Sequence, residues 1–279
     1  MEPVLGPESL AAGALTRGAL RWNYSRVQPR VHRPKEVAAT LAVRTLEAWL
    51  WSDRRAIIAG QAAAALHGAK WVTSTAPVEL ITEHTRKRAG IVVREERIAD
   101  DEICQVGDFR VTSPARTALD LARFAERNNA VARVDALAAA TGVTAQDALD
   151  IAGRYRRLRH VGRARTALDL MDAGAQSPQE TWLRLVLVDA GFPRPRTQIP
   201  LSHGGRCAYL DMGWEEPQIA LDYEGDHHRQ QRPTYVRDIG RYDMIERLGW
   251  LDLRVVREHS RAFIIHRVRE AAARRRWKF

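Results

Sequence analysis

The sequence has little cysteine: its 279 residues include only Cys104 and Cys207, and the two stand in no close motif. Neither a disulfide framework nor a zinc site built from thiolates is indicated, which fits a reducing compartment. Long apolar runs are also missing, and the N-terminus carries acids and glycines where a signal peptide would have a basic start and an apolar core. We therefore expect a cytoplasmic protein with no membrane partner.

Negative charge is in short supply as well. The chain has 44 Lys and Arg against 34 Asp and Glu, a net charge of +10, and the basic residues are mostly arginine. The planar guanidinium suits phosphate better than an ammonium group does, so the excess indicates a nucleic acid as partner, most simply double-stranded DNA. RNA stays open, because these features do not separate the two nucleic acids.

The basic residues are unevenly spread. Residues 154–165, RYRRLRHVGRAR, hold six arginines and no acid, and they lie in a stretch, 154–172, that we interpret as a linker. Arg156, Arg157 and Arg159 are our candidate phosphate contacts there. The alternative for such a run is a solvated face.

Residues 1–34 predict a short helix, SLAAGALTRG, followed by the alternating basic stretch ALRWNYSRVQPRVHRP. A short helix before a basic two-stranded ribbon is typical of the end of a winged helix, in which the ribbon contacts phosphates. We interpret this segment as partial and winged-helix-like. A basic β-hairpin on any surface would give the same pattern.

Residues 35–153 predict an α+β domain. IIAGQAAAALHGAKW is expected to be a small-residue helix, PVELIT and GIVVREERI are expected to be strands, and Thr112 or Ser113 can cap a helix that Pro114 starts. The heptapeptide ARTALDL occurs at 115–121 and again at 164–170. It is too short for a structural repeat, so we expect one helix start used twice.

Residues 173–279 predict a separate α/β domain. Its first helix has the clearest signals, with Ser177 as N-cap, Pro178 at the first helical position and Glu180 three residues after the cap. Strand and helix patterns then follow in the order α-β-β-β-α-β-α. This order predicts a mixed sheet covered by helices.

The stretch YLDMGWEEPQIALDYEGDHH, residues 209–228, is an acidic hairpin in a basic chain. If residues 215–218 form a four-residue turn, Trp214 pairs with Ile219 and Asp211 faces Asp222. Leu210, Met212 and Trp214 would share the opposite face.

Facing carboxylates repel each other, so something must offset their charge. One possibility is a divalent cation, Mg²⁺ or Mn²⁺, held between Asp211 and Asp222 with Glu224 nearby; the other is a raised pKa and a shared proton. A third interpretation is that Asp222 or Glu224 only faces solvent and pairs with an arginine.

Further polar residues follow the hairpin. His227 and His228 come after Gly225, and either imidazole could take a proton from a metal-bound water or bind a phosphate. Arg237 and Arg241 stand four residues apart on the next predicted helix and could clamp a backbone phosphate. Surface salt bridges are the alternative for these two arginines.

From about residue 170 to 257, SPQETWLRLVLVDAGFPRP, the acidic hairpin and IGRYDMIERLGW resemble the very-short-patch-repair-like branch of the PD-(D/E)XK endonuclease superfamily, in a form common in actinobacterial proteins. The resemblance implies a restriction-endonuclease-like αβββαβ core. It implies an acidic residue at Glu180, metal-binding acids at Asp211 and Asp222, and a histidine at His228 beside His227. Glu224 stands where the superfamily signature usually has lysine.

The N-terminal half resembles the antitoxin-like proteins of abortive-infection toxin–antitoxin systems, on IIAGQAAAALHGAKW, PVELIT and VTSPARTALDLARF. The resemblance implies a winged helix joined to a small α/β domain, and a toxin as protein partner. Our first hypothesis is a Mg²⁺-dependent DNA endonuclease or nickase with Glu180, Asp211, Asp222, Glu224, His227 and His228 as its site. The alternative is a catalytically inactive DNA-binding regulator or a protein of the toxin–antitoxin type.

Overall fold

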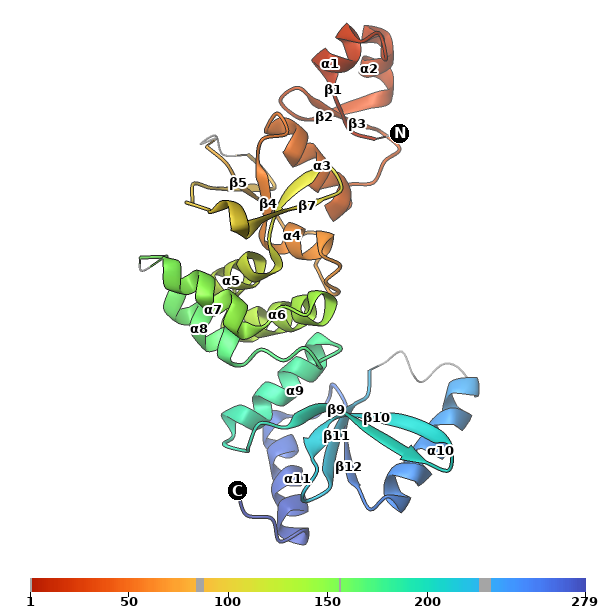
Figure 1. Ribbon diagram of the computed structural model, residues 1–279. Helices are drawn as coiled ribbons and strands as arrows, with labels where there is room; N and C mark the ends of the chain where they lie inside the picture. Colours follow the sequence, from red (N-terminus) through yellow and green to blue (C-terminus); the bar gives the residue numbers. More distant parts are fainter. Residues whose placement is uncertain (1, 84–87, 156, 226–231) are drawn as a thin grey trace. The chain divides into compact units, whose positions relative to one another are not determined.

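The computed structural model describes residues 2–83, 88–155, 157–225 and 232–279, with side chains given outside 232–239. The chain divides into two compact units, Met1–Met171 and Asp172–Phe279. The described residues contain three β-sheets and the helices that pack against them, so the predicted mixed α/β class is confirmed (Figure 1). In this part of the chain no helix combines the length and the apolar character needed to cross a bilayer.

The first unit begins with a small three-stranded sheet of order β1-β3-β2 and two short helices. The elements are β1 Val4–Leu5, α1 Gly6–Ala11, α2 Arg17–Asn23, β2 Tyr24–Gln28 and β3 Val31–Pro34. The expected ribbon is wrong up to Asn23, because the Thr16 hydroxyl accepts a hydrogen bond from the Ala19 N–H at 3.0 Å and starts a helix there. A strand, two helices and a hairpin fit the winged-helix-like interpretation.

A five-stranded sheet of order β6-β5-β4-β8-β7 follows. Its elements are α3 Leu41–Trp51, β4 Ile57–Ala59, α4 Gly60–Leu66, β5 Val78–Ile81, β6 Ile91–Arg94, β7 Ile103–Val106 and β8 Phe109–Thr112. The expectation of one helix over IIAGQAAAALHGAKW is wrong for its first residues. Residues Ile57–Ala59 form β4, and α4 begins at Gly60, which has a positive φ of 58°. Glycine suits this position because an added Cβ would lie 2.1 Å from the Glu79 carboxylate.

Four helices complete the first unit: α5 Pro114–Phe124, α6 Arg127–Thr141, α7 Ala145–Arg154 and α8 Val161–Asp169. Ser113 caps α5. The interpretation of 154–172 as a linker is wrong for α8, whose Ala164, Ala167 and Leu168 are buried. The two ARTALDL copies also differ, because α8 begins three residues before its copy and has no side-chain cap.

The second unit contains α9 Pro178–Asp189, β9 Arg196–His203, β10 Arg206–Trp214, β11 Ile219–Tyr223, α10 Arg232–Arg247, β12 Leu251–Val255 and α11 Arg261–Arg274. The predicted order α-β-β-β-α-β-α is confirmed, as is Ser177 as N-cap of α9. The sheet order is β12-β11-β10-β9, with β11 and β12 parallel and the other pairs antiparallel.

Helices cover both faces of this sheet (Figure 1). On one face, Leu183 and Leu187 of α9 and Val268 of α11 pack with the strands. On the other face, Met244 and Ile245 of α10 pack with the strands. Any charged side chain that points from a central strand is therefore taken out of water and needs a partner.

Candidate functional site

The acidic hairpin has the register that its sequence predicts. Trp214 pairs with Ile219 and Met212 with Leu221, so the turn is the expected four residues and the next positions along the strands are Asp211 and Asp222. The prediction that Leu210, Met212 and Trp214 share one face of the sheet is correct only in part. Met212 and Trp214 pack with α9 and α11, whereas Leu210 packs on the α10 side. Gln198, between the β9 residues that pair with Leu210 and Met212, has a positive φ of 49°. The strand is irregular where the acid lies.

The two carboxylates complete the strand pairing. Oδ1 of Asp222 accepts a hydrogen bond from the Asp211 N–H at 2.8 Å, and Oδ2 of Asp211 accepts one from the Tyr223 N–H, also at 2.8 Å. Asp222 is only 4% exposed. Each acid thus binds backbone of the opposite strand, which satisfies two partly buried N–H groups where the regular ladder ends.

Arg241 of α10 supplies positive charge to this pair. Its Nη2 donates to Oδ2 of Asp222 and, at 2.8 Å, to the backbone carbonyl of Tyr209. Burial lowers the pKa of Arg241, but Asp222, Asp211 and Asp252 outweigh burial and raise it. We expected Arg241 to clamp a backbone phosphate together with Arg237; the structure instead gives its guanidinium to the carboxylates of its own chain.

Burial first, and then the negative charges of Asp222 and Glu180, together raise the pKa of Asp211 to about 7. Burial likewise raises the pKa of Glu180, and Asp222 contributes to that rise. These three acids, which the sequence singled out together, therefore interact electrostatically in the folded unit. Two features reduce the repulsion between the facing acids: the raised pKa of Asp211 and the guanidinium of Arg241.

Glu180 also has a structural role. Its carboxylate accepts hydrogen bonds from the Ser177 hydroxyl and the Gln176 N–H, both at 2.9 Å, at the start of α9. The Ser177 hydroxyl in turn accepts from the Glu180 N–H at 3.2 Å. These bonds satisfy the first turn of the helix and by themselves explain a glutamate at this position.

Glu224 lies at the end of β11 and has partners of its own. Its Oε1 accepts from the Tyr242 hydroxyl at 3.2 Å and lies 3.5 Å from Nε of Arg254. Arg254 also stacks on the Tyr242 ring, 3.2 Å from the centroid. This is the arginine pairing at a strand end that the sequence left open as the third interpretation.

Asp252 on β12 is a site residue that our sequence reasoning missed. Burial, and next the Asp222 charge, raise its pKa to about 6. Neither carboxylate oxygen has a hydrogen-bond partner among the described residues, although Nε of Arg254 lies 3.5 Å away. The available signal was the acid inside the strand WLDLRVV, in which Arg254 is the one other charged residue, since a strand covered on both faces takes such a side chain out of water.

The described residues do not fit the expected Mg²⁺ or Mn²⁺ ion. Three of the four oxygens of Asp211 and Asp222 already accept hydrogen bonds from the protein. Among the described residues, no three Asp, Glu, His or Cys side chains are grouped so that they could hold a metal. His227 and His228 lie outside the described residues.

The other predicted phosphate contacts are placed as follows. Arg157 and Arg159 are exposed, which is compatible with binding a phosphate. Arg156 lies outside the described residues. Arg237 lies on α10, but its side chain is not among those described.

In the first unit, the motif VTSPARTALDLARF builds a buried ion network. Arg116 is fully buried and donates to Glu102 and Glu96, both at 2.6 Å, and to Asp120 at 3.2 Å. Arg123 donates to Asp120 at 2.8 Å and to Glu96 at 2.9 Å. Burial raises the pKa of Asp120 although three arginines oppose the rise. The motif therefore joins α5 to the connection between β6 and β7 and has a structural role.

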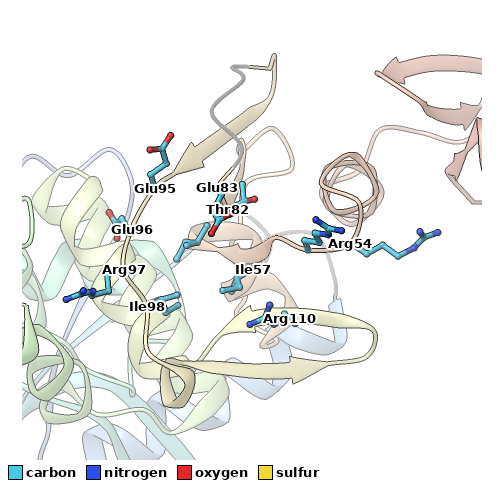
Figure 2. Close-up of a pocket in the computed structure, with 11 residues that line it drawn as sticks. Arg54, Ile57, Thr82, Glu83, Glu95, Glu96, Arg97, Ile98 and Arg110 are labelled. Atoms are coloured by element: carbon cyan, nitrogen blue, oxygen red, sulfur yellow. The ribbon is translucent and has the colours of Figure 1, made fainter.

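A hollow of about 830 Å³ lies beside this network (Figure 2). Ile57 and Ile98 lie between charged side chains of both signs, among them Glu83 and Arg110. Because charges of both signs surround the hollow, its lining does not select for either an anionic or a cationic ligand.

Most side chains of the α2 helix, in the N-terminal segment, are exposed to solvent. No residue of α2 is buried, and Arg17, Arg21 and Trp22 are exposed, with Trp22 at 70%. Arg26 on β2 is exposed as well. Arg30 contacts Asp53 at 2.9 Å in an exposed ion pair. This surface combines arginines and an aromatic ring, as nucleic-acid interfaces do.

Comparison with known proteins gives one family match. Two similar proteins are the uncharacterized proteins MT2308 and Rv2248 of Mycobacterium tuberculosis, strains CDC 1551 / Oshkosh and ATCC 25618 / H37Rv. Each is 28% identical over 195 residues, which cover 70% of this chain and 72% of the relative. No solved structure matches. The family match does not reach the second unit: residues 54–170 of this chain match the AbiEi antitoxin C-terminal domain, which supports the antitoxin-like prediction for this part.

Proposed function

We propose that this chain is a DNA-binding regulator of the toxin–antitoxin type. The match of residues 54–170 to the AbiEi antitoxin C-terminal domain is the observation that carries the proposal. The segment before it, with two short helices and a basic hairpin, supports DNA binding by the same chain. The net charge of +10 agrees with this assignment.

The α2 helix is the element that we assign to the major groove. Arg17 and Arg21 stand one turn apart on an exposed helix, and Trp22 follows them. A helix of this kind reads base edges through its outward side chains while the neighbouring hairpin contacts the backbone.

The β2–β3 hairpin is the element that we assign to the phosphates. Arg26 is exposed, and the Arg30–Asp53 pair is an exposed contact of a kind worth about 0–1 kcal/mol. Phosphates can compete for a guanidinium held that weakly. A toxin would be the protein partner, and residues 54–170, which match the antitoxin domain, are where we place its binding.

The experiment that tests this proposal is titration of a labelled duplex DNA, read by fluorescence anisotropy at several salt concentrations. The double variant Arg17→Ala, Arg21→Ala should bind at least about tenfold more weakly, with a shallower dependence on salt. Arg269→Ala, which removes an exposed arginine from the second unit, is the matched control and should bind as the wild type does. Absence of wild-type binding, or equal binding by both variants, would contradict the proposal; preference for an RNA duplex would redirect it to RNA.

Phosphodiester hydrolysis with Mg²⁺ or Mn²⁺ is a second candidate function, in which the ion would have to displace bonds that the protein now makes to the carboxylates of Asp211 and Asp222. The facing carboxylates Asp211 and Asp222, with the raised pKa of Asp211, are the observation that favours it, because perturbed acids gather at active sites. The test is incubation of supercoiled plasmid and of mismatched duplex with each ion. Cleavage that disappears in Asp211→Ala and Asp222→Ala supports a nuclease; intact DNA that is still bound contradicts it.

A further inference from the structure

We propose that Arg241 takes the place that a metal ion was predicted to fill: its guanidinium balances the charge of the Asp211–Asp222 pair and fastens α10 to the sheet, so that the second unit keeps this acid pair without a metal. The inference concerns the second unit alone and does not depend on DNA binding. It follows from the disagreement between the metal-binding prediction and the bonds that the carboxylates make.

Three of the four carboxylate oxygens of the Asp211–Asp222 pair are already bonded within the protein. Both oxygens of Asp222 are used, one by the Asp211 N–H and one by Nη2 of Arg241, and Oδ2 of Asp211 is used by the Tyr223 N–H. Mg²⁺ binds through carboxylate oxygens and gives up its water reluctantly. An ion at this place would have to displace an arginine from a buried carboxylate.

The guanidinium of Arg241 connects α10 to the sheet. Nη2 of Arg241 binds Asp222 on β11 and the Tyr209 carbonyl on β10, so one side chain of α10 bridges two adjacent strands. Its charge also acts on Asp211 and Asp252, which together with Asp222 raise its pKa against the effect of burial. One fixed cation thus faces three acids.

Removal of the Arg241 charge would destabilise the second unit. Asp222 is 4% exposed and would be left as a buried charge without a counter-ion. Breaking a buried pair by deleting one partner is strongly unfavourable, because the remaining charge cannot be hydrated. Arg241 is therefore a positioning residue for α10 as well as a counter-charge.

The test uses the full chain and measures thermal unfolding by circular dichroism with EDTA and with excess Mn²⁺. We expect the wild-type midpoint to be the same in both. Arg241→Met, which keeps the bulk and removes the charge, should lower the midpoint of the second unit by about 5 °C or more. Arg247→Met removes an exposed arginine from the same helix, as a control, and should leave the midpoint unchanged.

Direct Mn²⁺ binding, measured from the electron paramagnetic resonance signal of the free ion, makes the test independent of how well a variant folds. The proposal is supported if wild-type protein and Asp222→Asn bind Mn²⁺ to the same extent, or if neither binds it. Binding that stabilises the wild type and is absent from Asp222→Asn overturns it. So does an Arg241→Met protein as stable as Arg247→Met.

Discussion

Asp222 accepts a hydrogen bond from the backbone N–H of Asp211, the residue that faces it across the hairpin, at 2.8 Å. Two acidic side chains thereby become part of the strand pairing. The arrangement depends on Arg241 and on the raised pKa of Asp211. It makes the stability of the second unit sensitive to pH and to single substitutions.

The raised pKa of Asp211 predicts a loss of stability with rising pH. The folded value is about 7 and the ordinary value 3.8, so the folded unit holds a proton that the unfolded chain releases. The contribution is fully present below about pH 4 and is lost as the pH rises through 7. Urea unfolding of wild type and Asp211→Asn from pH 5 to 8 should show the stability difference moving in favour of the variant. A difference independent of pH would contradict the assignment.

Gly213 is required for the close approach of β10 and β11. An added Cβ would lie 2.4 Å from the Ile219 carbonyl oxygen and 3.0 Å from Cα of Ala220. Gly213→Ala should therefore cost about 1–3 kcal/mol in the free energy of unfolding, because the strands must move apart. Gly18→Ala, in the exposed helix α2 with only the Thr16 hydroxyl near, is the comparison and should be neutral or stabilising. An equal effect of the two substitutions would show that the backbone approach does not matter.

The ion network of the first unit predicts a large effect at Arg116. Its guanidinium is fully buried and binds Glu102 and Asp120, so Arg116→Met leaves buried carboxylates without their partner. We expect a loss of about 3–5 kcal/mol in the unfolding free energy of this unit. Arg110→Met, at an exposed position of β8, should change it little. A small effect at Arg116 would mean that the acids take up protons at low cost.

The bonds of Glu180 predict a role in stability. Ser177→Ala removes the hydroxyl that binds both the Glu180 carboxylate and the Glu180 N–H, and should destabilise the second unit by about 1 kcal/mol. Glu180→Gln keeps an acceptor and should cost less. Calorimetric unfolding measures both. If Glu180→Gln instead changed DNA cleavage with unaltered stability, the structural role would be wrong and the endonuclease hypothesis favoured.

The exposed ring of Trp22 predicts separate effects on binding and folding. Since its side chain is 70% exposed, Trp22→Ala should change the unfolding free energy by no more than about 0.5 kcal/mol. The same change should weaken duplex DNA binding if α2 is the reading helix, as measured by anisotropy. Unaltered affinity would remove Trp22, though not Arg17 or Arg21, from the proposed interface.

Local signals in the sequence determined much of the second unit. Ser177 and Pro178 gave the start of α9, because capping depends on residues adjacent in the chain. The hairpin register followed from side-chain alternation and turn length, so the pairing of Trp214 with Ile219 and the opposition of Asp211 and Asp222 were predictable. Net charge and the antitoxin-like motifs indicated the class of partner.

The tertiary structure decided what those residues do. Arg241 and Asp222 are 19 residues apart in the chain, and Asp252 reaches the acids only because β12 lies beside β11, so neither contact has a signal in local spacing. We predicted a linker where α8 lies because this stretch is rich in arginine. The three small or apolar residues that are buried in the structure, Ala164, Ala167 and Leu168, give only a weak signal in the sequence. Periodicity and caps are local and can be read from the chain. Charge balance among buried groups depends on which distant elements pack together, and only the folded structure contains that information.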